Sequence, residues 1–151
     1  MRDRLMIGGL ALAAALALGG CSGGRPPPNL GVMEGRLAPC PDSPNCVSSQ
    51  ATDESRWGWP LRYLDDPAPA RDRLLAVLDG MERVLIVRAD IDYIHAEFTS
   101  AVFGFVDDVE FQFDAPGFIQ IRSASRTGYY DFGANRERVE AIRQRFVATD
   151  H

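Results

Sequence analysis

The sequence predicts a two-layer α+β domain, in which an antiparallel sheet of four to five strands carries two helices packed on one face. Three observations lead to this prediction: an apolar stripe at helical spacing after residue 66, strand-like alternation between residues 83 and 125, and a second helical stripe near the C-terminus. The 151 residues fit a single domain. No internal repeat is visible in the sequence.

The first 20 residues have the composition of an export signal. A short charged start precedes an apolar run over residues 5–18, which is too short to span a bilayer and is typical of a signal peptide. Small residues come directly before Cys21, a pattern that resembles a lipobox, where cleavage leaves a cysteine whose thiol carries a diacylglycerol. We therefore expect membrane attachment through a lipid anchor on Cys21, with an ordinary signal peptide as the alternative.

The start of the mature chain indicates where the protein is located. Ser22 at the second mature position resembles the outer-membrane sorting pattern of Gram-negative bacteria, so we expect the cell envelope, on the outer membrane facing the periplasm. Residues 21–38 show no apolar period and are predicted to be a lipidated cysteine and a flexible tether, followed by one domain over residues 39–151. A net charge of −5 at pH 7 outside the cytoplasm argues against nucleic acid as a partner.

Two cysteines remain after Cys21. Cys40 and Cys46 form an even pair in an oxidising compartment, which predicts a disulfide. The chain-entropy model gives about 2 kcal/mol of stabilisation for so short a loop. Zinc is a weaker alternative, because two cysteines without a nearby histidine make a poor site. A redox motif would need closer spacing.

Two short extended segments and a helix are predicted before residue 81. The segments cover residues 47–49 and 56–63, and the second is an edge strand because Pro60 cannot donate to a central ladder. Asp66 is expected to cap a helix that begins with prolines, runs to about residue 78 and ends at Gly80. The last helix is predicted over residues 135–147, with Asn135 as its N-cap.

Strands are predicted between the two helices. Residues 83–88 enclose the run Val-Leu-Ile-Val and are expected to form a buried strand. Residues 93–100 alternate between two faces, with Ile94, Ala96 and Phe98 on one face and Tyr93, His95, Glu97 and Thr99 on the other.

Residues 105–125 predict a hairpin with a defined register. A three-residue turn at 115–117 sets Asp114 opposite Phe118. In that register, apolar residues meet on one face, while Glu110 meets Arg122 on the other. This pairing of opposite charges across two neighbouring strands supports the register.

Charge is segregated along the second half of the chain. Residues 89–121 contain seven acidic residues and no arginine, whereas residues 122–146 contain six arginines and three acidic residues. We expect the two segments to pair with each other across the sheet. The hairpin register also places Asp107 opposite Ser125, at the end of the apolar face, where a buried carboxylate needs partners.

Three motifs resemble a known family. They are Pro-Asn-Cys-Val-Ser-Ser at 44–49, Phe-Val-Asp-Asp-Val-Glu-Phe at 105–111, and Arg-Ser-Ala-Ser-Arg at 122–126 followed by Gly128, Asp131, Gly133, Asn135 and Arg136. Together they resemble the uncharacterised family known as domain of unknown function 1499, over roughly residues 39–146. The resemblance implies one folded domain and an extracytoplasmic location, as in bacterial lipoproteins and chloroplast lumen proteins. It implies no activity.

A polar cluster is predicted around the turn that joins the last strand to the last helix. Its members are Asp107, Asp108, Glu110, Arg122, Ser123, Ser125, Arg126, Asp131, Asn135 and Arg136. The first interpretation is a buried polar network, in which Asp107 accepts hydrogen bonds from Ser125 or from loop amides and Arg126 ties the loop at 128–130 to the sheet. The second is a pocket for an anionic group, built from Arg126, Arg136 and the start of the last helix.

No catalytic constellation, metal site or cofactor is expected. Alternation sends Asp107 to one face of the sheet and Asp108 and Glu110 to the other, so the three cannot converge on a metal. A hydrolytic trio of His95, Asp107 and Ser125 would be divided between the faces in the same way. The sequence therefore predicts a non-catalytic domain that binds a small amphiphile or an envelope protein. The alternative is a hydrolase or isomerase that uses Asp107 and Ser125.

Overall fold

A computed structural model describes residues 24–149. The predictions for the signal peptide and for Cys21 therefore lie outside the described residues. Within residues 24–149, no helix combines the length and the apolar character that crossing a membrane requires.

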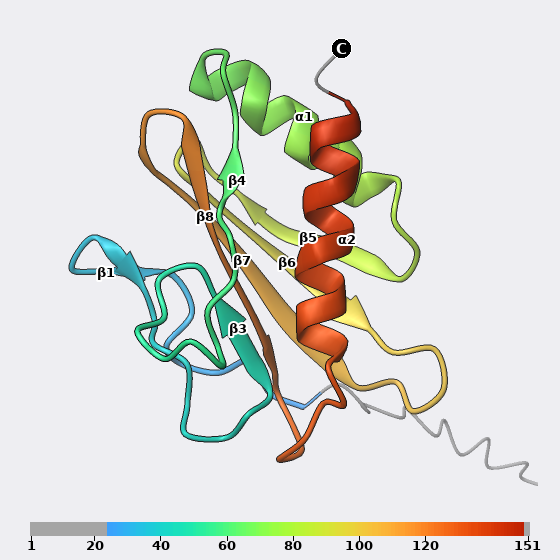
Figure 1. Cartoon of the computed structure of the whole chain (residues 1–151). Coiled ribbons are helices and arrows are strands. Elements are labelled where there is room, and N and C mark those ends of the chain that lie inside the picture. Colours follow the sequence, from blue (N-terminus) through green and yellow to red (C-terminus); the bar gives the residue numbers. More distant parts are fainter. Residues whose placement is uncertain (1–23, 150–151) are drawn as a thin grey trace, which may run out of the picture.

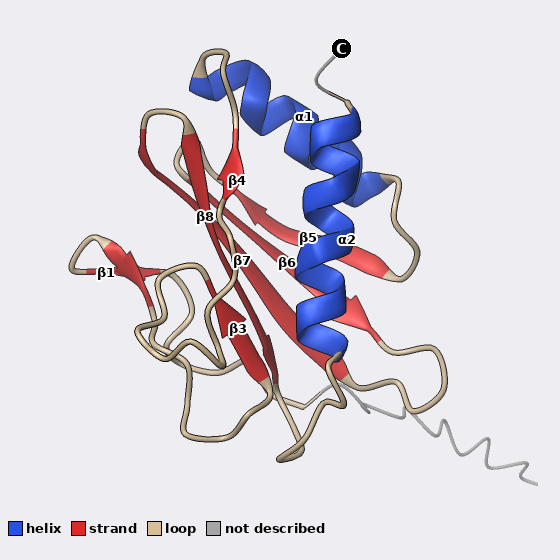
Figure 2. Cartoon of the chain, viewed as in Figure 1, coloured by secondary structure: helices blue, strands red, loops and turns tan. Residues whose placement is uncertain are grey.

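The fold is a six-stranded antiparallel sheet with two helices (Figures 1 and 2). The helices are α1 (Pro67–Asp79) and α2 (Ala134–Ala148). The sheet strands are β3 (Cys46–Ser48), β4 (Leu61–Arg62), β5 (Val84–Ala89), β6 (Tyr93–Thr99), β7 (Val106–Ala115) and β8 (Phe118–Ser125). Their order is β3-β8-β7-β6-β5, and β4 also pairs with β8. This confirms the α+β class, with more strands than the sequence predicted.

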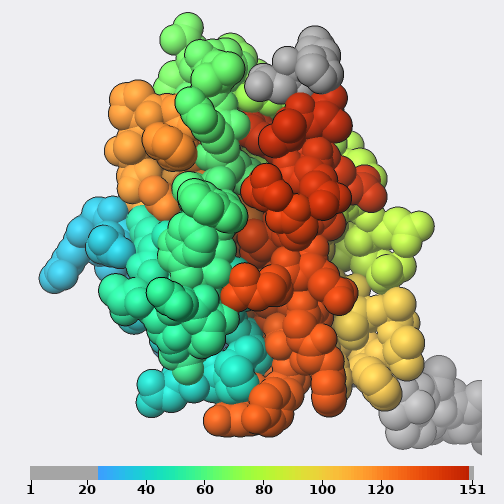
Figure 3. Space-filling view, in the orientation of Figure 1, coloured from blue at the N-terminus to red at the C-terminus, as the bar shows by residue number. Residues whose placement is uncertain are grey.

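Both helices lie on one face of the sheet, as predicted (Figure 1). The core between the two layers includes strand residues such as Phe111 and Ile121 and helix residues such as Leu74, Ile142 and Phe146, all at most 1% exposed. Each such side chain contributes about 1.5–3 kcal/mol by leaving water. On the outer surface of this layer, the chain that leads to β4 lies alongside α2 (Figure 3).

The β7–β8 hairpin has the predicted register along most of its length. Glu110 is paired with Arg122, and Phe111 with Ile121. The predicted turn is wrong, because Ala115 rather than Asp114 lies opposite Phe118 and the register shifts between Gln112 and Ala115. The turn is therefore shorter than predicted, and its Gly117 adopts φ +85°, a left-handed conformation that glycine allows.

The strand predicted to be buried, β5, lies at the edge of the sheet. Leu85 and Val87 are 61% and 50% exposed, so this prediction is wrong. Only Val84 and Ile86, on the other side of the strand, pack against the core. A run of four apolar residues does not distinguish an edge strand with one covered face from a central strand with two.

The face of the sheet opposite the helices is covered by the N-terminal part of the described chain. This covering segment, residues 24–41, includes a two-stranded sheet of β1 (Val32–Met33) and β2 (Arg36–Leu37). Gly31 N donates to Glu110 Oε1 at 2.7 Å, and Gln112 Nε2 donates to Gly35 O at 2.8 Å. Residues 24–38, expected to be a free tether, therefore pack on the sheet through hydrogen bonds that leave no periodic signal in the sequence.

The predicted disulfide is present between Cys40 and Cys46, with an S–S distance of 2.06 Å. Cys46 begins β3 and is 1% exposed. The disulfide therefore joins the end of the covering segment to the sheet.

Candidate functional site

The ten predicted site residues are divided between the two faces of the sheet. Alternation along β7 and β8 causes the division, because successive side chains point to opposite faces. Asp107, Ser123 and Ser125 lie on the face that carries the helices, together with Asp131 and Asn135. Asp108, Glu110, Arg122 and Arg126 lie on the face under the covering segment, and Arg136 is on the outer side of α2.

Asn135 organises the cluster on the helix face. It is fully buried, and its Nδ2 donates to Asn45 O at 3.0 Å, Ser125 Oγ at 2.9 Å and Asp131 Oδ2 at 2.8 Å. It is not the N-cap of α2 as predicted, because Gly133 holds that position with φ +87°. The side chain instead joins the first turn of α2 to β8 and to the disulfide loop.

The carbonyl oxygen of Asn135 extends this network to Asp107. Asn135 Oδ1 accepts from Ser123 Oγ at 2.6 Å and from Arg138 Nη1 at 2.8 Å. Arg138 Nη2 then donates to Asp107 Oδ2 at 2.6 Å. The partner of Asp107 is therefore Arg138 of α2, and not Ser125 or a loop amide as predicted. The first interpretation, a buried polar network, agrees with these contacts, but its hydrogen-bond pairs differ from the predicted ones.

The predicted anion pocket at the start of α2 is filled by the chain itself. Asp131 Oδ1 accepts from Gly133 N at 3.1 Å, and Asp131 Oδ2 accepts from Asn135 N at 2.9 Å. Burial acts to raise the pKa of Asp131, but these hydrogen bonds outweigh it and lower the pKa below its ordinary value. The carboxylate therefore occupies the place that a bound anion would take.

The two arginines predicted for that pocket lie apart. Arg136 donates to Trp57 O at 3.1 Å and to Ser55 O at 2.8 Å, which fastens α2 to the chain before β4. Arg126 lies on the opposite face of the sheet. The loop at 128–130 is tied down by Asn45, whose Nδ2 donates to Gly128 O at 2.6 Å, and not by Arg126 as predicted.

Within the hydrolytic trio, Asp107 and Ser125 lie opposite each other on β7 and β8, but other side chains already bind them. Asp107 is bound by Arg138, and Ser125 Oγ accepts from Asn135. His95 lies on the opposite face, with Nε2 2.8 Å from Asp108 Oδ1. Ser125 borders the smaller of the two cavities described below, and Asp107 borders neither of them.

Glu110 and Arg122 form the first buried ion pair under the covering segment. Glu110 is fully buried, and its Oε2 accepts from Arg122 Nη1 at 2.9 Å, which confirms the predicted pair. Its Oε1 accepts from Tyr93 OH at 2.8 Å and from Gly31 N. Burial, together with the negative charge of Glu110, raises the pKa of Tyr93 well above its ordinary value, so the tyrosine remains a neutral donor.

Arg126 is at the centre of the second buried cluster on this face. Arg126 Nε and Nη2 donate to the two oxygens of Asp108 at 2.8 and 2.7 Å, and Nη2 also contacts Glu97. These bonds raise the pKa of Arg126 above its ordinary value. His95, Glu97 and Asp108 have ligand atoms within 4.8 Å of one another, but the guanidinium already supplies the positive charge between the two carboxylates.

From the environment of the Asp108 carboxylate, we predict that the free energy of unfolding decreases in acid. Burial acts to raise its pKa, but hydrogen bonds from Arg126 and His95 outweigh burial and hold the pKa below the ordinary value of 3.8. Because the folded-state pKa is depressed, Asp108 contributes stability above about pH 4, and that contribution is lost as the pH falls through the folded-state value. We expect the free energy of unfolding to fall more steeply below pH 4 in the wild type than in Asp108→Asn, as measured by urea titration from pH 2 to 7.

A second variant checks the cause of this shift. Arg126→Gln removes the main hydrogen-bond donor to Asp108, so burial should dominate and raise the folded-state pKa, and the part of the acid-induced loss of stability that comes from Asp108 should disappear. Parallel pH profiles for the wild type and Asp108→Asn would contradict the assignment.

A cavity of about 360 Å³ lies between the covering segment and this polar face. It is lined by Arg25, Pro27, Asn29, Pro39, Cys40, Pro41, Asp108, Arg122, Ala124, Ser125 and Arg126. Arg122 is only 3% exposed, and its Nε is buried without a hydrogen-bond partner. Four of the ten predicted site residues therefore border one cavity, and one of them has an unused donor.

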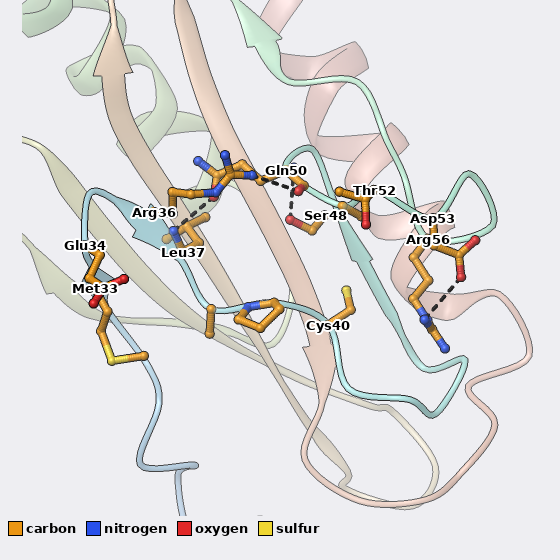
Figure 4. Close-up of a pocket in the computed structure, with 13 residues that line it drawn as sticks. Met33, Glu34, Arg36, Leu37, Cys40, Ser48, Gln50, Thr52, Asp53 and Arg56 are labelled. Carbon is orange, nitrogen blue, oxygen red and sulfur yellow. Dashed lines mark hydrogen bonds and ion pairs between the residues drawn. The ribbon is translucent and has the colours of Figure 1, made fainter.

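A larger groove of about 590 Å³ lies beside β2 and the disulfide (Figure 4). Its polar groups are mostly bound to one another: Arg36 donates to Gln50 O at 3.0 Å, and Arg56 donates to Asp53 Oδ2 at 3.2 Å. Arg56 Nε has no partner, but this side chain is 23% exposed and not deeply buried. The groove contains none of the ten predicted residues, so we place the candidate site in the smaller cavity.

Sequence reasoning missed several residues of both clusters. Arg138 was not selected, although it lies three positions after Asn135, on the same side of the helix. Alternation placed Tyr93 and His95 on the same face of β6, and the register sets His95 opposite Glu110. Tyr93 is therefore on the face that carries Glu110, and this signal could have identified it as a partner of Glu110. Gly31 gave no signal, because its backbone amide makes the contact.

The family comparison agrees with the motifs. The family model described as a protein of unknown function, DUF1499, matches residues 36–146. This match covers the disulfide, both polar clusters and most of α2. No protein in the curated set matches the sequence.

Proposed function

Because the chain belongs to the DUF1499 family, whose description assigns no activity, we propose a function from the site itself. The protein is a lipid-anchored domain of the cell envelope that has no catalytic role and binds a small amphiphile with an anionic head group. The ligand occupies the cavity of about 360 Å³ between the covering segment and the sheet. The observation that carries the proposal is that three arginines, Arg25, Arg122 and Arg126, and only one carboxylate, Asp108, line that cavity.

The charges around the cavity favour an anionic head group. Arg122 pairs with Glu110, and Arg126 pairs with Asp108 and Glu97, whereas Arg25 is exposed and has no ion-pair partner within residues 24–149. Arg25 is therefore available to form a charge-assisted hydrogen bond with a carboxylate, which is stronger than one with a neutral oxygen.

The remaining walls favour an apolar tail. Pro27, Pro39, Pro41, Ala124 and the disulfide at Cys40 contribute apolar surface to the same cavity. A volume of about 360 Å³ lies within the range of small-molecule sites, which are mostly apolar with a few placed polar groups. A short acyl chain that ends in a carboxylate has this chemistry.

Envelope location and lipid anchoring are supported by sequence and by one structural feature. The apolar run over residues 5–18 and the small residues before Cys21 suit an exported lipoprotein. The disulfide between Cys40 and Cys46 suits an oxidising compartment. An anchored domain would also meet amphiphiles at the membrane surface.

Octanoate binding tests the proposal. The chain from Ser22 onwards, exported to an oxidising periplasm and purified without detergent, should bind octanoate in a calorimetric titration. Octanol, with the same chain length and no charge, should bind about tenfold more weakly, since a charge-assisted hydrogen bond contributes about 1.5–3 kcal/mol.

A matched pair of variants locates the binding site. Arg25→Gln should weaken octanoate binding about tenfold, because it removes the cavity arginine that has no ion-pair partner within residues 24–149. Arg36→Gln makes the same change in the larger groove and should bind as the wild type does. Equal affinity for octanoate and octanol, or equal loss in both variants, would contradict the proposal.

A further inference from the structure

Two loops leave the sheet side by side at the same end of the domain. One, residues 100–105, joins β6 to β7, and the other, residues 126–133, joins β8 to α2 (Figure 1). The strands that carry them are neighbours: Asp107 pairs with Ser125, and Arg126 N donates to Val106 O at 3.2 Å. The positions that follow β8 therefore lie beside those that precede β7.

These loops expose large apolar and aromatic side chains. We call this set the aromatic edge, and its six members, between 49% and 96% exposed, are Val102, Phe103, Phe105, Tyr129, Tyr130 and Phe132. The rings of Phe103 and Phe105 are 5.5 Å apart, and those of Tyr129 and Tyr130 are 4.9 Å apart. Single exposed apolar residues are ordinary, but a group of six on adjoining loops indicates an interaction surface.

The outer surface of the aromatic edge is almost without charge. Residues 100–105 contain no side chain that is charged at neutral pH, and residues 127–133 contain one, Asp131. Asp131 is turned inward, where it accepts hydrogen bonds from the start of α2. Arg126 is turned away, into its cluster with Asp108 and Glu97.

The described chain begins at this same end. Gly24 O accepts from Arg126 Nη1 at 3.4 Å, and a Cβ atom on Gly24 would lie 3.7 Å from Thr127 Cγ2, in the second loop. Cys21 precedes Gly24 by three positions, and three residues span at most about 11 Å. A lipid on Cys21 would therefore enter a bilayer within about 11 Å of Gly24.

We propose that the aromatic edge inserts into the interfacial layer of the lipid bilayer that holds the anchor. This inference rests on the lipid anchor of the proposed function. Tyrosine and other aromatic side chains favour the boundary between acyl chains and water, and a second attachment next to a lipid fixes how a domain sits on the membrane. Only three positions separate Gly24 from Cys21, so a lipid on Cys21 holds the aromatic edge close to the membrane surface. This favours a bilayer over a protein partner.

The proposed orientation has a consequence for the cavity. Arg25 and Pro27, which line it, follow directly after Gly24. With the aromatic edge in the bilayer, these two residues lie close to the membrane surface, and an amphiphile can pass between the bilayer and the cavity over a short path.

Environment-sensitive labels test the inference on the full-length protein. The protein is expressed with its leader in a Gram-negative host, its diacylglycerol is verified by mass spectrometry, and it is reconstituted into vesicles of phosphatidylethanolamine and phosphatidylglycerol. An NBD fluorophore on Val102→Cys should shift its emission to shorter wavelength on reconstitution. The matched label on Leu64→Cys should not shift, because Leu64 is equally exposed, at 81% against 82%, and precedes α1 at the other end of the domain.

A second variant separates insertion from mere proximity to the anchor. With Phe103, Tyr130 and Phe132 all replaced by serine, the label at Val102→Cys should lose its shift, while lipidation and flotation with the vesicles remain unchanged. All three side chains are exposed, so the fold does not depend on them. An unshifted label on verified lipoprotein overturns the inference and leaves the anchor and octanoate binding standing, whereas a chain without diacylglycerol overturns the anchor and the inference together.

Discussion

Replacing Glu110 with alanine should destabilise the domain by about 3–5 kcal/mol, because it leaves the buried guanidinium of Arg122 without a counter-charge. Glu110 is fully buried and accepts three hydrogen bonds, from Arg122, Tyr93 and the amide of Gly31. Alanine leaves all three donors unsatisfied under the covering segment. A loss of this size is a large part of the 5–15 kcal/mol that holds a typical domain folded.

Urea unfolding followed by circular dichroism measures this loss. Glu140→Ala is the matched control, since Glu140 pairs with Arg143 on the exposed side of α2 and such surface pairs contribute about 0–1 kcal/mol. A Glu110→Ala variant no less stable than Glu140→Ala would contradict the account of the buried pair.

A double variant tests whether the domain needs the buried ion pair itself or only needs to avoid a buried charge without a partner. Glu110→Leu combined with Arg122→Leu removes both charges together, and such replacements are often neutral or stabilising. We expect most of the loss seen in Glu110→Ala to be recovered. Recovery should be incomplete, because Tyr93 OH and Gly31 N still lack an acceptor.

The Glu110–Arg122 pair also shows why part of this fold follows from sequence. Alternation along two strands joined by a short turn fixes which side chains face each other, and opposite charges confirm the register locally. The error in the turn is local as well, because the shift between Gln112 and Ala115 absorbs it before Phe111 is reached. Strand pairing close in sequence is therefore predictable.

What could not be predicted is the layer over the polar face. Its contacts are made by backbone groups such as Gly31 N and Gly35 O, which every residue type carries and no pattern marks. Without that layer, Tyr93 and His95 are expected on a solvated face, although both are buried. Because the sequence did not predict this layer, it did not predict the cavity either, which lies between residues 24–41 and the sheet.

The partner of Asp107 depended on long-range packing. The segregation of acidic residues and arginines correctly indicated that the two segments pair with each other. Which arginine meets Asp107 depends on how α2 docks, and this docking brings Arg138 to Asp107. The sequence shows that acidic residues and arginines are present in segments that can pair, whereas the tertiary structure decides which two side chains form each ion pair.

Replacing Asn135 with aspartate should cost about 2–4 kcal/mol, although the two side chains have nearly the same shape. The amide of Asn135 donates to Asn45 O, Ser125 Oγ and Asp131 Oδ2, and a carboxylate has no hydrogen to donate to them. It also places a second negative charge 2.8 Å from Asp131. Arg138, which already donates to Asn135 Oδ1, neutralises part of that charge, which keeps the expected loss below that of Glu110→Ala.

Gln144→Glu makes the same change from amide to carboxylate on the same helix and is the matched control. Gln144 is exposed and donates only to Glu140 Oε1, so we expect a loss of no more than about 0.5 kcal/mol in urea unfolding. Hydrogen exchange should also become faster in Asn135→Asp at residues 127–134, because Asn135 and Asn45 hold that loop against β8. If Asn135→Asp matched Gln144→Glu in both measurements, the hydrogen bonds of Asn135 would contribute nothing measurable to stability. The conformation of the loop that carries Tyr129, Tyr130 and Phe132 would then depend on the disulfide and the backbone alone.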